Sequence, residues 1–348
     1  MADVSGNGAL DEGLSRLAGT GPEYGNGMSN HGPMGAEALV RLGRADAVER
    51  WLDGYLGRLD GPPRATDPIT DANWRDALGE PNRVADWEAY LLARLAAEPW
   101  RDVLARWWPR LLPGVAAAAT HGVIRTSHAA RSLASAGPHA CLRRDELARG
   151  LAYWAASYLE LPGRPRTAGR LDLAMAVRAL PVVEGQVTGD LISARLRAGL
   201  ASEPGFAPAV AALRPPADPA ADLRDLAREF ARIFLAYGRR QPITFLHAVT
   251  APVAAYSVLP LLPGELARPT YDALWQAGAA LYTVHAGGVT PEPLPATPPQ
   301  SPDDLADRAV RTGDAHAIKL TEACLRLHAE SADPVLLHAA ARASDLLA

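Results

Sequence analysis

DLRDLAREFARIFLAYG, residues 222–238, shows most clearly which class of fold this chain adopts. Its apolar residues recur at steps of three and four, which is the period of an α-helix with one buried face. The same spacing occurs in ADAVERWLDGYLGRL (45–59), RVADWEAYLLARLAAEPW (83–100) and ELARGLAYWAASYLEL (146–161). No alternating apolar and polar run of comparable length, the pattern typical of a strand, is present. The sequence therefore predicts an all-α protein.

Three segments interrupt this helical pattern, at 161–170, 214–222 and 286–304. The last of them is rich in proline and is expected to form an extended surface connection before the C-terminal helices. Asp333-Pro334 then predicts the start of a closing helix, because aspartate is a good N-cap and proline fits the first turn. Composition does not shift clearly at these breaks. We therefore expect one large helical domain over residues 1–348, with two closely packed lobes as its possible subdivision.

Composition narrows the classes of protein that fit. Apolar residues make up 48% of the 348 residues, charged residues 21%, and the net charge is −4, as in an ordinary globular protein. No basic patch points to nucleic acid, and no leader-like start or bilayer-spanning run points to secretion or a membrane. The two cysteines, Cys141 and Cys324, lie far apart and form no CxxC motif, so the sequence suggests neither a disulfide framework nor a thiolate zinc site. We expect a cytoplasmic protein.

Lys319 is the only lysine among 35 lysine and arginine residues. Arginine always carries its charge, whereas lysine can act as a neutral amine, form a Schiff base, or become carbamylated to an anionic oxygen ligand. Lys319 follows His316 by three positions, so the two side chains share one helical face. If both are buried, the imidazole must be neutral and the amine must have a lowered pKa or be modified. The alternative is a chance lysine on the surface.

Three other segments place histidines among constrained neighbours. His31 follows a glycine-rich loop just before a predicted helix, and His247 lies in an apolar helix after three of the four phenylalanines. His121 is expected at the end of an alanine-rich helix, sharing one face with Arg125 and His128. Buried polar groups need partners, which a metal ion would supply. Histidines bonded to backbone carbonyls, or acid–base groups beside a Schiff-base lysine, are the alternatives.

Two further features receive simpler interpretations. His285 is expected at a helix end, where an imidazolium would face the negative end of the helix dipole. Trp107 and Trp108 are expected to pack in the core rather than to form a ligand platform. No nucleotide-binding glycine loop in a βαβ unit is recognisable, so a Rossmann-type flavin site is not expected.

Taken in order along the chain, NHGPM, HGVIRTSHA, TFLHAVT and HAIK resemble the questin oxidase-like family, whose fungal members oxidise aromatic polyketides such as anthraquinones. The resemblance runs through most of the length. It implies an oxidoreductase of secondary metabolism that opens a ring of an aromatic or polycyclic ketone by NADPH-dependent Baeyer–Villiger-type chemistry. The characteristic histidines of that family fall here on His31, His121, His247 and His316, and its lysine falls on Lys319.

The resulting hypothesis is a non-haem Fe(II) centre that reacts with dioxygen, as a monooxygenase or a dioxygenase. The four histidines would hold the metal, and a carbamylated Lys319 would add an anionic oxygen ligand. Iron is preferred to zinc because the reactions of the family are redox reactions and zinc is redox-silent. Asn30, Arg125 and His128 are assigned supporting catalytic roles, such as orienting ligands or binding a phenolate. The alternatives are a metal-free or Schiff-base lysine enzyme and a non-catalytic helical ligand-binding protein.

Overall fold

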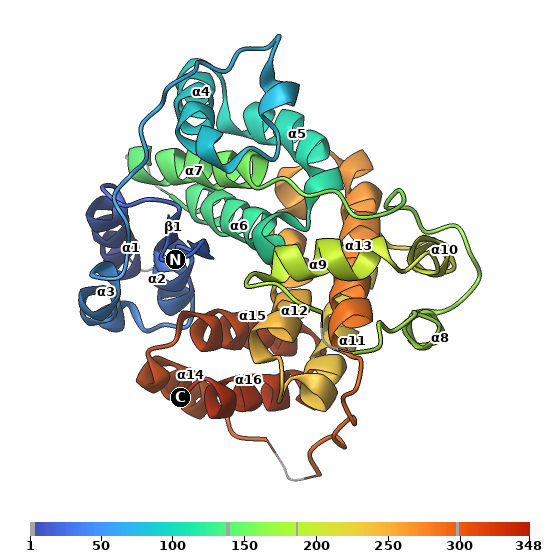
Figure 1. Ribbon diagram of the computed structural model, residues 1–348. Helices are drawn as coiled ribbons and strands as arrows, with labels where there is room; N and C mark the ends of the chain where they lie inside the picture. The colour runs from blue at the N-terminus through green and yellow to red at the C-terminus, as the bar shows by residue number, and fades with distance from the viewer. Residues whose placement is uncertain (1–3, 137–139, 186, 297–298) are drawn as a thin grey trace. The chain divides into compact units, whose positions relative to one another are not determined.

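A computed structural model describes residues 4–136, 140–185, 187–296 and 299–348. Over these residues the chain forms sixteen α-helices, short 3₁₀ turns and one two-stranded hairpin, so the prediction of an all-α protein is confirmed (Figure 1). The contacts of the chain divide it into two compact units, Met1–Leu159 and Glu160–Ala348.

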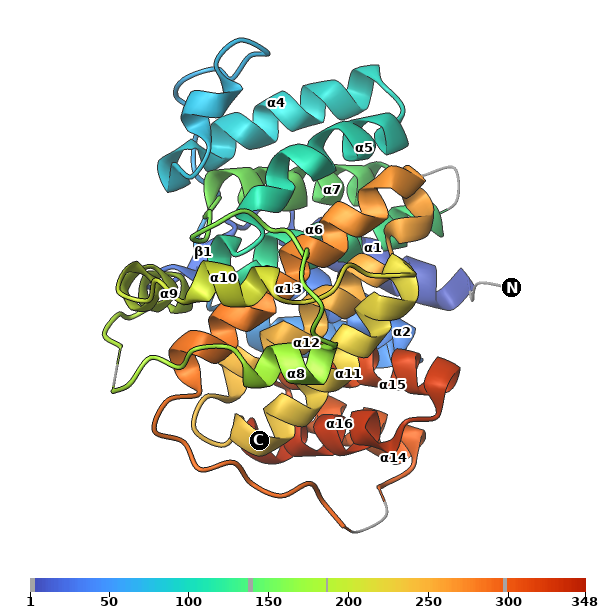
Figure 2. The same ribbon diagram turned by 90° about the vertical axis from the view of Figure 1, so that its right-hand side faces the viewer.

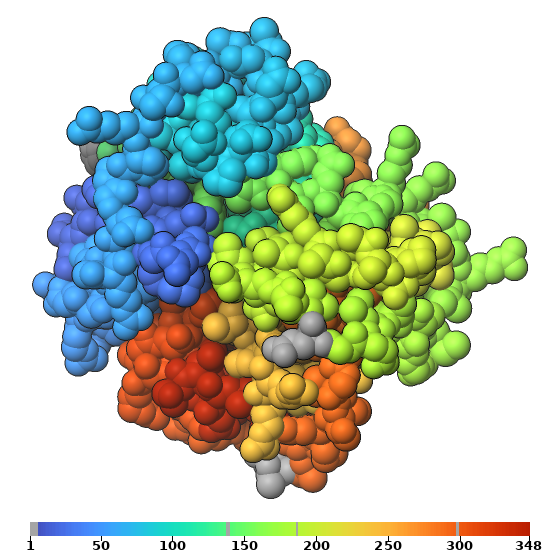
Figure 3. Space-filling model, viewed as in Figure 1, coloured from blue at the N-terminus to red at the C-terminus, as the bar shows by residue number. Residues whose placement is uncertain are grey.

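The first unit contains seven helices over its described residues. Its helices are α1 (Val4–Leu17), α2 (Gly32–Arg41), α3 (Val48–Leu56), α4 (Val84–Ala97), α5 (Trp100–Leu111), α6 (His121–Ala134) and α7 (Cys141–Ala156). A hairpin of β1 (Glu23–Tyr24) and β2 (Met28–Ser29) leads into α2. The α6 and α7 helices pack along each other, with α4 against α7 and α2 against α6. The connection from α3 to α4 runs over the surface of this unit, where residues 60–68 are exposed (Figure 3).

The core of the first unit contains a cluster of aromatic rings. Trp107 and Trp108 are fully buried, which confirms that they are core residues. The edges of Trp74 and Trp87 meet the ring of Trp107, with centroids 5.1 and 5.3 Å away. Trp108 meets Trp154 of α7 in the same way, at 5.3 Å. These edge-to-face contacts are the favoured geometry for aromatic pairs and fix α5 against its neighbours.

The alanine-rich segment before His121 departs from the expected helix. Ala118, Ala119 and Thr120 have φ values of 45°, 56° and 70°, so three successive residues adopt the left-handed conformation. His121 therefore begins α6 instead of ending a helix, and the prediction for this segment is wrong. Alanine has high helix propensity, but propensity is a weak preference that tertiary packing can override. A right-handed helix cannot continue through three left-handed residues.

The second unit contains nine helices over its described residues. They are α8 (Leu173–Arg178), α9 (Ile192–Ala201), α10 (Phe206–Ala211), α11 (Pro219–Tyr237), α12 (Pro242–Tyr256), α13 (Ala267–His285), α14 (Pro302–Thr312), α15 (Ala315–Ser331) and α16 (Pro334–Leu346). The α11 and α12 helices pack together, as do α15 and α16, and α12 also contacts α15 (Figure 2). The carboxylate of Asp333 accepts the backbone N–H of Val335, which confirms the predicted cap of α16. Between α13 and α14 the described residues form no helix, as the proline content predicts.

One segment of this unit has the composition of a membrane span. Pro242–Leu261 is long and apolar enough to cross a bilayer, with a mean hydropathy of 1.4, so the expectation that the chain has no such run is wrong for this segment. Within it, 72% of the most apolar window is buried inside the protein. A core helix of a soluble protein has the same properties, so the segment is compatible with a soluble protein.

Candidate metal-binding and polar sites

His31 and His121 form a buried pair within the first unit. His31 is the N-cap of α2 and His121 is the first residue of α6, so two helix starts hold the two rings. The rings are stacked, with centroids 4.7 Å apart and an angle of 15° between their planes. Their Nε2 atoms are 2.8 Å apart. This is hydrogen-bond distance, so one Nε2 donates to the other; two imidazole nitrogens held this close are also placed as neighbouring ligands of a metal ion would be.

The backbone fixes the tautomer of His121. Its Nδ1 lies 2.6 Å from the carbonyl oxygen of Ala118. Because a carbonyl oxygen can only accept a hydrogen bond, Nδ1 carries the proton, and Nε2 of the neutral ring presents a lone pair. Histidines that bind metals typically make this bond through their other ring nitrogen. His121 is thus arranged as a metal ligand through Nε2.

Asn30 anchors the loop that ends at His31. Its side-chain amide donates to the carbonyl oxygen of Gly21 at 2.8 Å and to the hydroxyl of Thr20 at 3.1 Å. Its side-chain oxygen accepts the backbone N–H of Gly32 at 2.9 Å. Asn30 therefore holds the backbone before and after His31 in place and does not contact the imidazole in these bonds.

Arg125 points from α6 to α7, where it pairs with Glu146. Both side chains are buried, and the guanidinium donates from Nε and Nη2 to the two carboxylate oxygens at 2.6 and 2.9 Å. Burial by itself would lower the pKa of Arg125, but Glu146 reverses this effect and raises it, so the arginine stays charged. Its third nitrogen, Nη1, has no hydrogen-bond partner among the described residues. Arg125 therefore keeps one donor for another acceptor.

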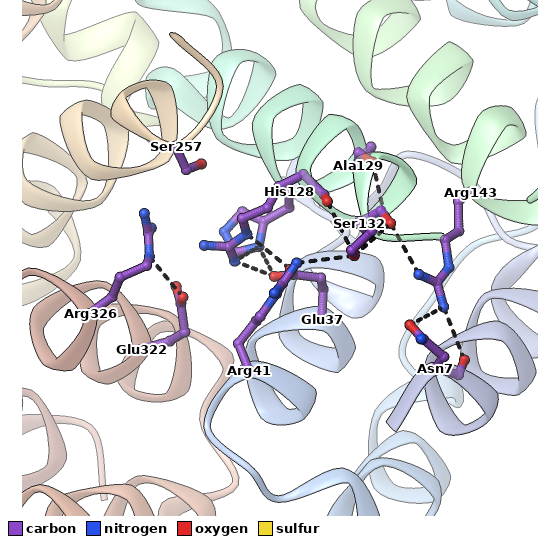
Figure 4. Close-up of polar contacts among 12 residues, drawn as sticks. Asn7, Glu37, Arg41, His128, Ala129, Ser132, Arg143, Ser257, Glu322 and Arg326 are labelled. Carbon is purple, nitrogen blue, oxygen red and sulfur yellow. Dashed lines mark hydrogen bonds and ion pairs between the residues drawn. The ribbon is translucent and has the colours of Figure 1, made fainter. Parts of the chain in front are cut away.

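His128 belongs to a buried network centred on Glu37 of α2. The carboxylate of Glu37 accepts from His128 Nδ1 at 2.9 Å, from Arg41 Nε at 3.0 Å and from Arg131 (Figure 4). Burial alone would raise the pKa of Glu37, but Arg131 and His128 outweigh it and hold the pKa well below 4.5. The ionised Glu37 orients the imidazole of His128, as a carboxylate does in a carboxylate–histidine dyad.

His247 and His316 form a second pair, within the second unit. They project from α12 and α15, with ring centroids 5.5 Å apart and an angle of 68° between the rings. His247 is completely buried. Burial lowers the pKa of His316, although Asp314 partly opposes the shift, so this imidazole is neutral near pH 7.

Lys319 lies one turn beyond His316 on α15 and is 1% exposed. A chance surface lysine, one alternative from the sequence, is therefore wrong. Its Nζ has no hydrogen-bond partner among the described residues. Burial lowers the pKa of this amine to about 7, with Asp314 opposing the shift. A buried amine with this pKa is about half neutral near pH 7. The sequence led us to expect a lowered pKa, or a modified amine, if His316 and Lys319 were both buried.

The structure thus places the five predicted ligands in two groups. The first unit brings His31 and His121 together, and the second brings His247 and His316 together with Lys319 on the same helix as His316. His31, His121 and His316 each offer one ring nitrogen as a possible metal ligand. Sequence reasoning missed Glu37 and Glu146, the partners of His128 and Arg125. Glu37 gave a detectable signal, since it is a charged residue among the apolar positions of GPMGAEALVR.

His285 differs from its predicted state. It ends α13, as expected, but it is buried, and burial together with Arg195 lowers its pKa to about 4. The ring is therefore neutral near pH 7, and the predicted imidazolium is wrong. At this position the free-energy cost of burying a charged imidazole exceeds the stabilisation that the helix dipole would give it.

A surface pocket of about 920 Å³ lies between residues 65–72 and α4 in the first unit. Alanines and aspartates line most of it, and Tyr90 is its one aromatic residue. The pocket is therefore not lined mainly by aromatic rings.

Comparison with known proteins finds no family model and no curated sequence that matches this chain. The two histidine pairs and the polar groups around them are therefore the features of this chain that bear on its function.

Proposed function

We propose that this protein is a metal-dependent oxidoreductase that acts with dioxygen on an aromatic, polyketide-like ketone. The observation that carries the proposal is the convergence of His31 and His121, whose Nε2 atoms lie 2.8 Å apart while the Ala118 carbonyl holds the proton of His121 on Nδ1. Two adjacent buried imidazoles, one of them held by a backbone carbonyl at its other ring nitrogen, are suited to a divalent metal.

The donor set favours iron in this proposal. His31, His121, His247 and His316 would supply imidazole nitrogens, and a carbamylated Lys319 would supply an anionic oxygen. This combination of nitrogen and oxygen ligands suits non-haem Fe(II). The buried, partly neutral amine of Lys319 is the form that reacts with carbon dioxide. When bound, iron would supply the one-electron chemistry that dioxygen requires.

The residues of the chain itself would bind and orient the substrate. Arg125 can donate from Nη1 to a phenolate oxygen of an aromatic substrate, while Glu146 holds the rest of the guanidinium in place. His128, oriented by Glu37, can accept a proton from a substrate hydroxyl. The resemblance to the questin oxidase-like family supports this substrate class, NADPH as the electron donor, and a cytoplasmic location.

Metal analysis of the purified protein tests the proposal. We expect one iron per chain after anaerobic reconstitution of the wild type, and loss of that iron in both His121→Ala and His316→Ala. His338→Ala, a half-buried histidine on α16, is the matched control and should retain it. The hypothesis from the sequence assigns both histidine pairs to one ion, so two ions per chain, each lost in only one variant, would contradict a single centre. A reconstituted wild type without metal would contradict the proposal and favour a protein in which the histidines are packed structurally.

The lowered pKa of Lys319 favours one second candidate, a Schiff-base enzyme. In that case borohydride should trap a carbonyl substrate on the wild-type protein and not on Lys319→Arg. Trapping with a metal-free wild type would establish this candidate over the metal centre.

A further inference from the structure

Thr120 combines two costly features directly before His121. Its φ of 70° and ψ of 3° lie in the left-handed region, which is an outlier for a β-branched residue. A glycine would adopt the same backbone conformation without a steric penalty. The backbone of this turn therefore does not explain why a threonine occupies the position.

The side chain of Thr120 is costly as well. The residue is 2% exposed, and its hydroxyl has no hydrogen-bond partner among the described residues. A buried hydroxyl without a partner loses its hydrogen bonds to water and gains none in return. Backbone strain of this kind clusters at sites that bind ligands.

Two nearby residues share the buried hydroxyl of Thr120 but not its left-handed backbone. Thr126 and Ser127 of α6 are also fully buried, and neither hydroxyl has a partner in the described part of the chain. Both have ordinary helical backbone, so glycine would not relieve any left-handed strain there. Among these three hydroxyl residues, Thr120 alone combines the strain with a position next to His121.

We propose that the hydroxyl of Thr120 hydrogen-bonds to an oxygen- or nitrogen-bearing small molecule that binds beside the His31–His121 pair. The inference rests on the proposed function, since it assigns a ligand contact to the same site. A hydroxyl can both donate and accept, so it can serve a ligand atom of either kind. Thr120 would then be a ligand-binding residue of this site.

Stability provides the first test. Thr120→Gly removes the left-handed penalty, and Thr120→Ala removes the β-branch and the unpartnered hydroxyl. Both variants should unfold at a higher temperature than the wild type, by roughly 3 °C or more for Thr120→Gly. Thr126→Val, which removes a buried hydroxyl from ordinary helix, controls for the hydroxyl alone. An unchanged or lower melting temperature for Thr120→Gly would overturn the assignment of strain.

Ligand binding provides the second test, with cobalt(II) as the metal and azide as the small molecule. We expect wild type, Thr120→Ala, Thr120→Gly and Thr126→Val to bind cobalt with similar affinity. Azide, followed by the visible spectrum of cobalt, should bind roughly three- to tenfold more weakly to Thr120→Ala and Thr120→Gly. Thr120→Ser, which keeps the hydroxyl, should restore most of the azide affinity, and Thr126→Val should match the wild type.

The outcomes distinguish this inference from the proposed function. If both Thr120→Ala and the wild type bind cobalt, and both bind azide with the same affinity, the role of Thr120 is overturned and the metal site stands. Failure of the wild-type protein to bind cobalt would overturn the metal site, and the role of Thr120 with it.

Discussion

Glu37 is a buried carboxylate that three cationic or potentially cationic side chains surround. Arg41, His128 and Arg131 reach it from α2 and α6, so the charge is neutralised and every carboxylate oxygen accepts a hydrogen bond. Burying a charge is unfavourable unless such partners are present. Removing one partner leaves the remaining buried charges uncompensated and destabilises the folded protein. Glu37 therefore fixes the orientation of His128 and stabilises the contact between α2 and α6.

We expect Glu37→Gln to destabilise the protein by roughly 3 kcal/mol, because it leaves the mostly buried side chains of Arg131 and His128 without a counter-charge. Asp53→Asn is the control. Asp53 also pairs with an arginine, Arg16 at 2.6 Å, but it is exposed, and its loss should cost less than about 1 kcal/mol. Guanidinium unfolding measures both changes. Equal effects of the two substitutions would contradict the role given to Glu37.

Glu37 also predicts acid sensitivity. Its pKa in the folded protein is below 4.5, so the unfolded chain takes up a proton first as the pH falls. The contribution of Glu37 is therefore complete above pH 4.5 and is lost below it. The unfolding free energy of Glu37→Gln should vary less with pH than that of the wild type in this acid range.

His285 predicts a second acid dependence at higher pH. Its pKa is about 4 in the folded protein and 6.5 in the unfolded chain, so unfolding takes up a proton between these values. Stability should fall on the order of 3 kcal/mol as the pH drops from 6.5 to 4, given about 1.4 kcal/mol per pKa unit. His285→Leu should remove this slope. A slope that persists in His285→Leu would assign it to other groups.

At the scale of elements, glycines set how closely α6 and α7 approach. A Cβ on Gly122 would lie 2.7 Å from Trp154, and one on Gly150 would lie 3.0 Å from the backbone of Thr126. The helices therefore meet at backbone distance where these glycines lie. The same contact supports the start of α6, where His121 is held.

We expect Gly122→Ala to destabilise the protein by about 1–3 kcal/mol, because the added methyl group forces α6 and α7 apart. Gly54→Ala on α3 is the control. Its new Cβ would meet nothing within 4 Å, so alanine should stabilise the helix by roughly 0.5–1 kcal/mol. Thermal unfolding of the two variants should show shifts of opposite sign, and a shift of the same sign would contradict the packing argument.

At the scale of the whole molecule, the single lysine makes a direct test of burial possible. Lys319 is 1% exposed, so an amine-directed reagent can reach it only when the second unit opens. Trinitrobenzenesulfonate should modify Lys319 slowly in native buffer and rapidly in denaturant, with the α-amine as the internal reference. Rapid modification in native buffer would show that Lys319 is accessible in the native protein.

The helical period, the caps and the proline-rich break were visible in the sequence because they depend on neighbours within a few residues. For the same reason the sequence predicted that His31 precedes a helix, that His247 lies inside one, and that His316 and Lys319 share a face. Local periodicity is sufficient for these features, since a helix repeats its contacts every three or four residues.

Only the tertiary structure placed His31 against His121, 90 positions apart, and paired His128 with Glu37 and Arg125 with Glu146. It also gave left-handed backbone to Ala118, Ala119 and Thr120, at the end of an alanine run that by propensity should be helical. Contacts between distant segments and strained backbone conformations are stable only when packing compensates for them, and that compensation has no local signature. The sequence therefore determined the helices and the chemistry available on them, and the packing determined which of those side chains meet.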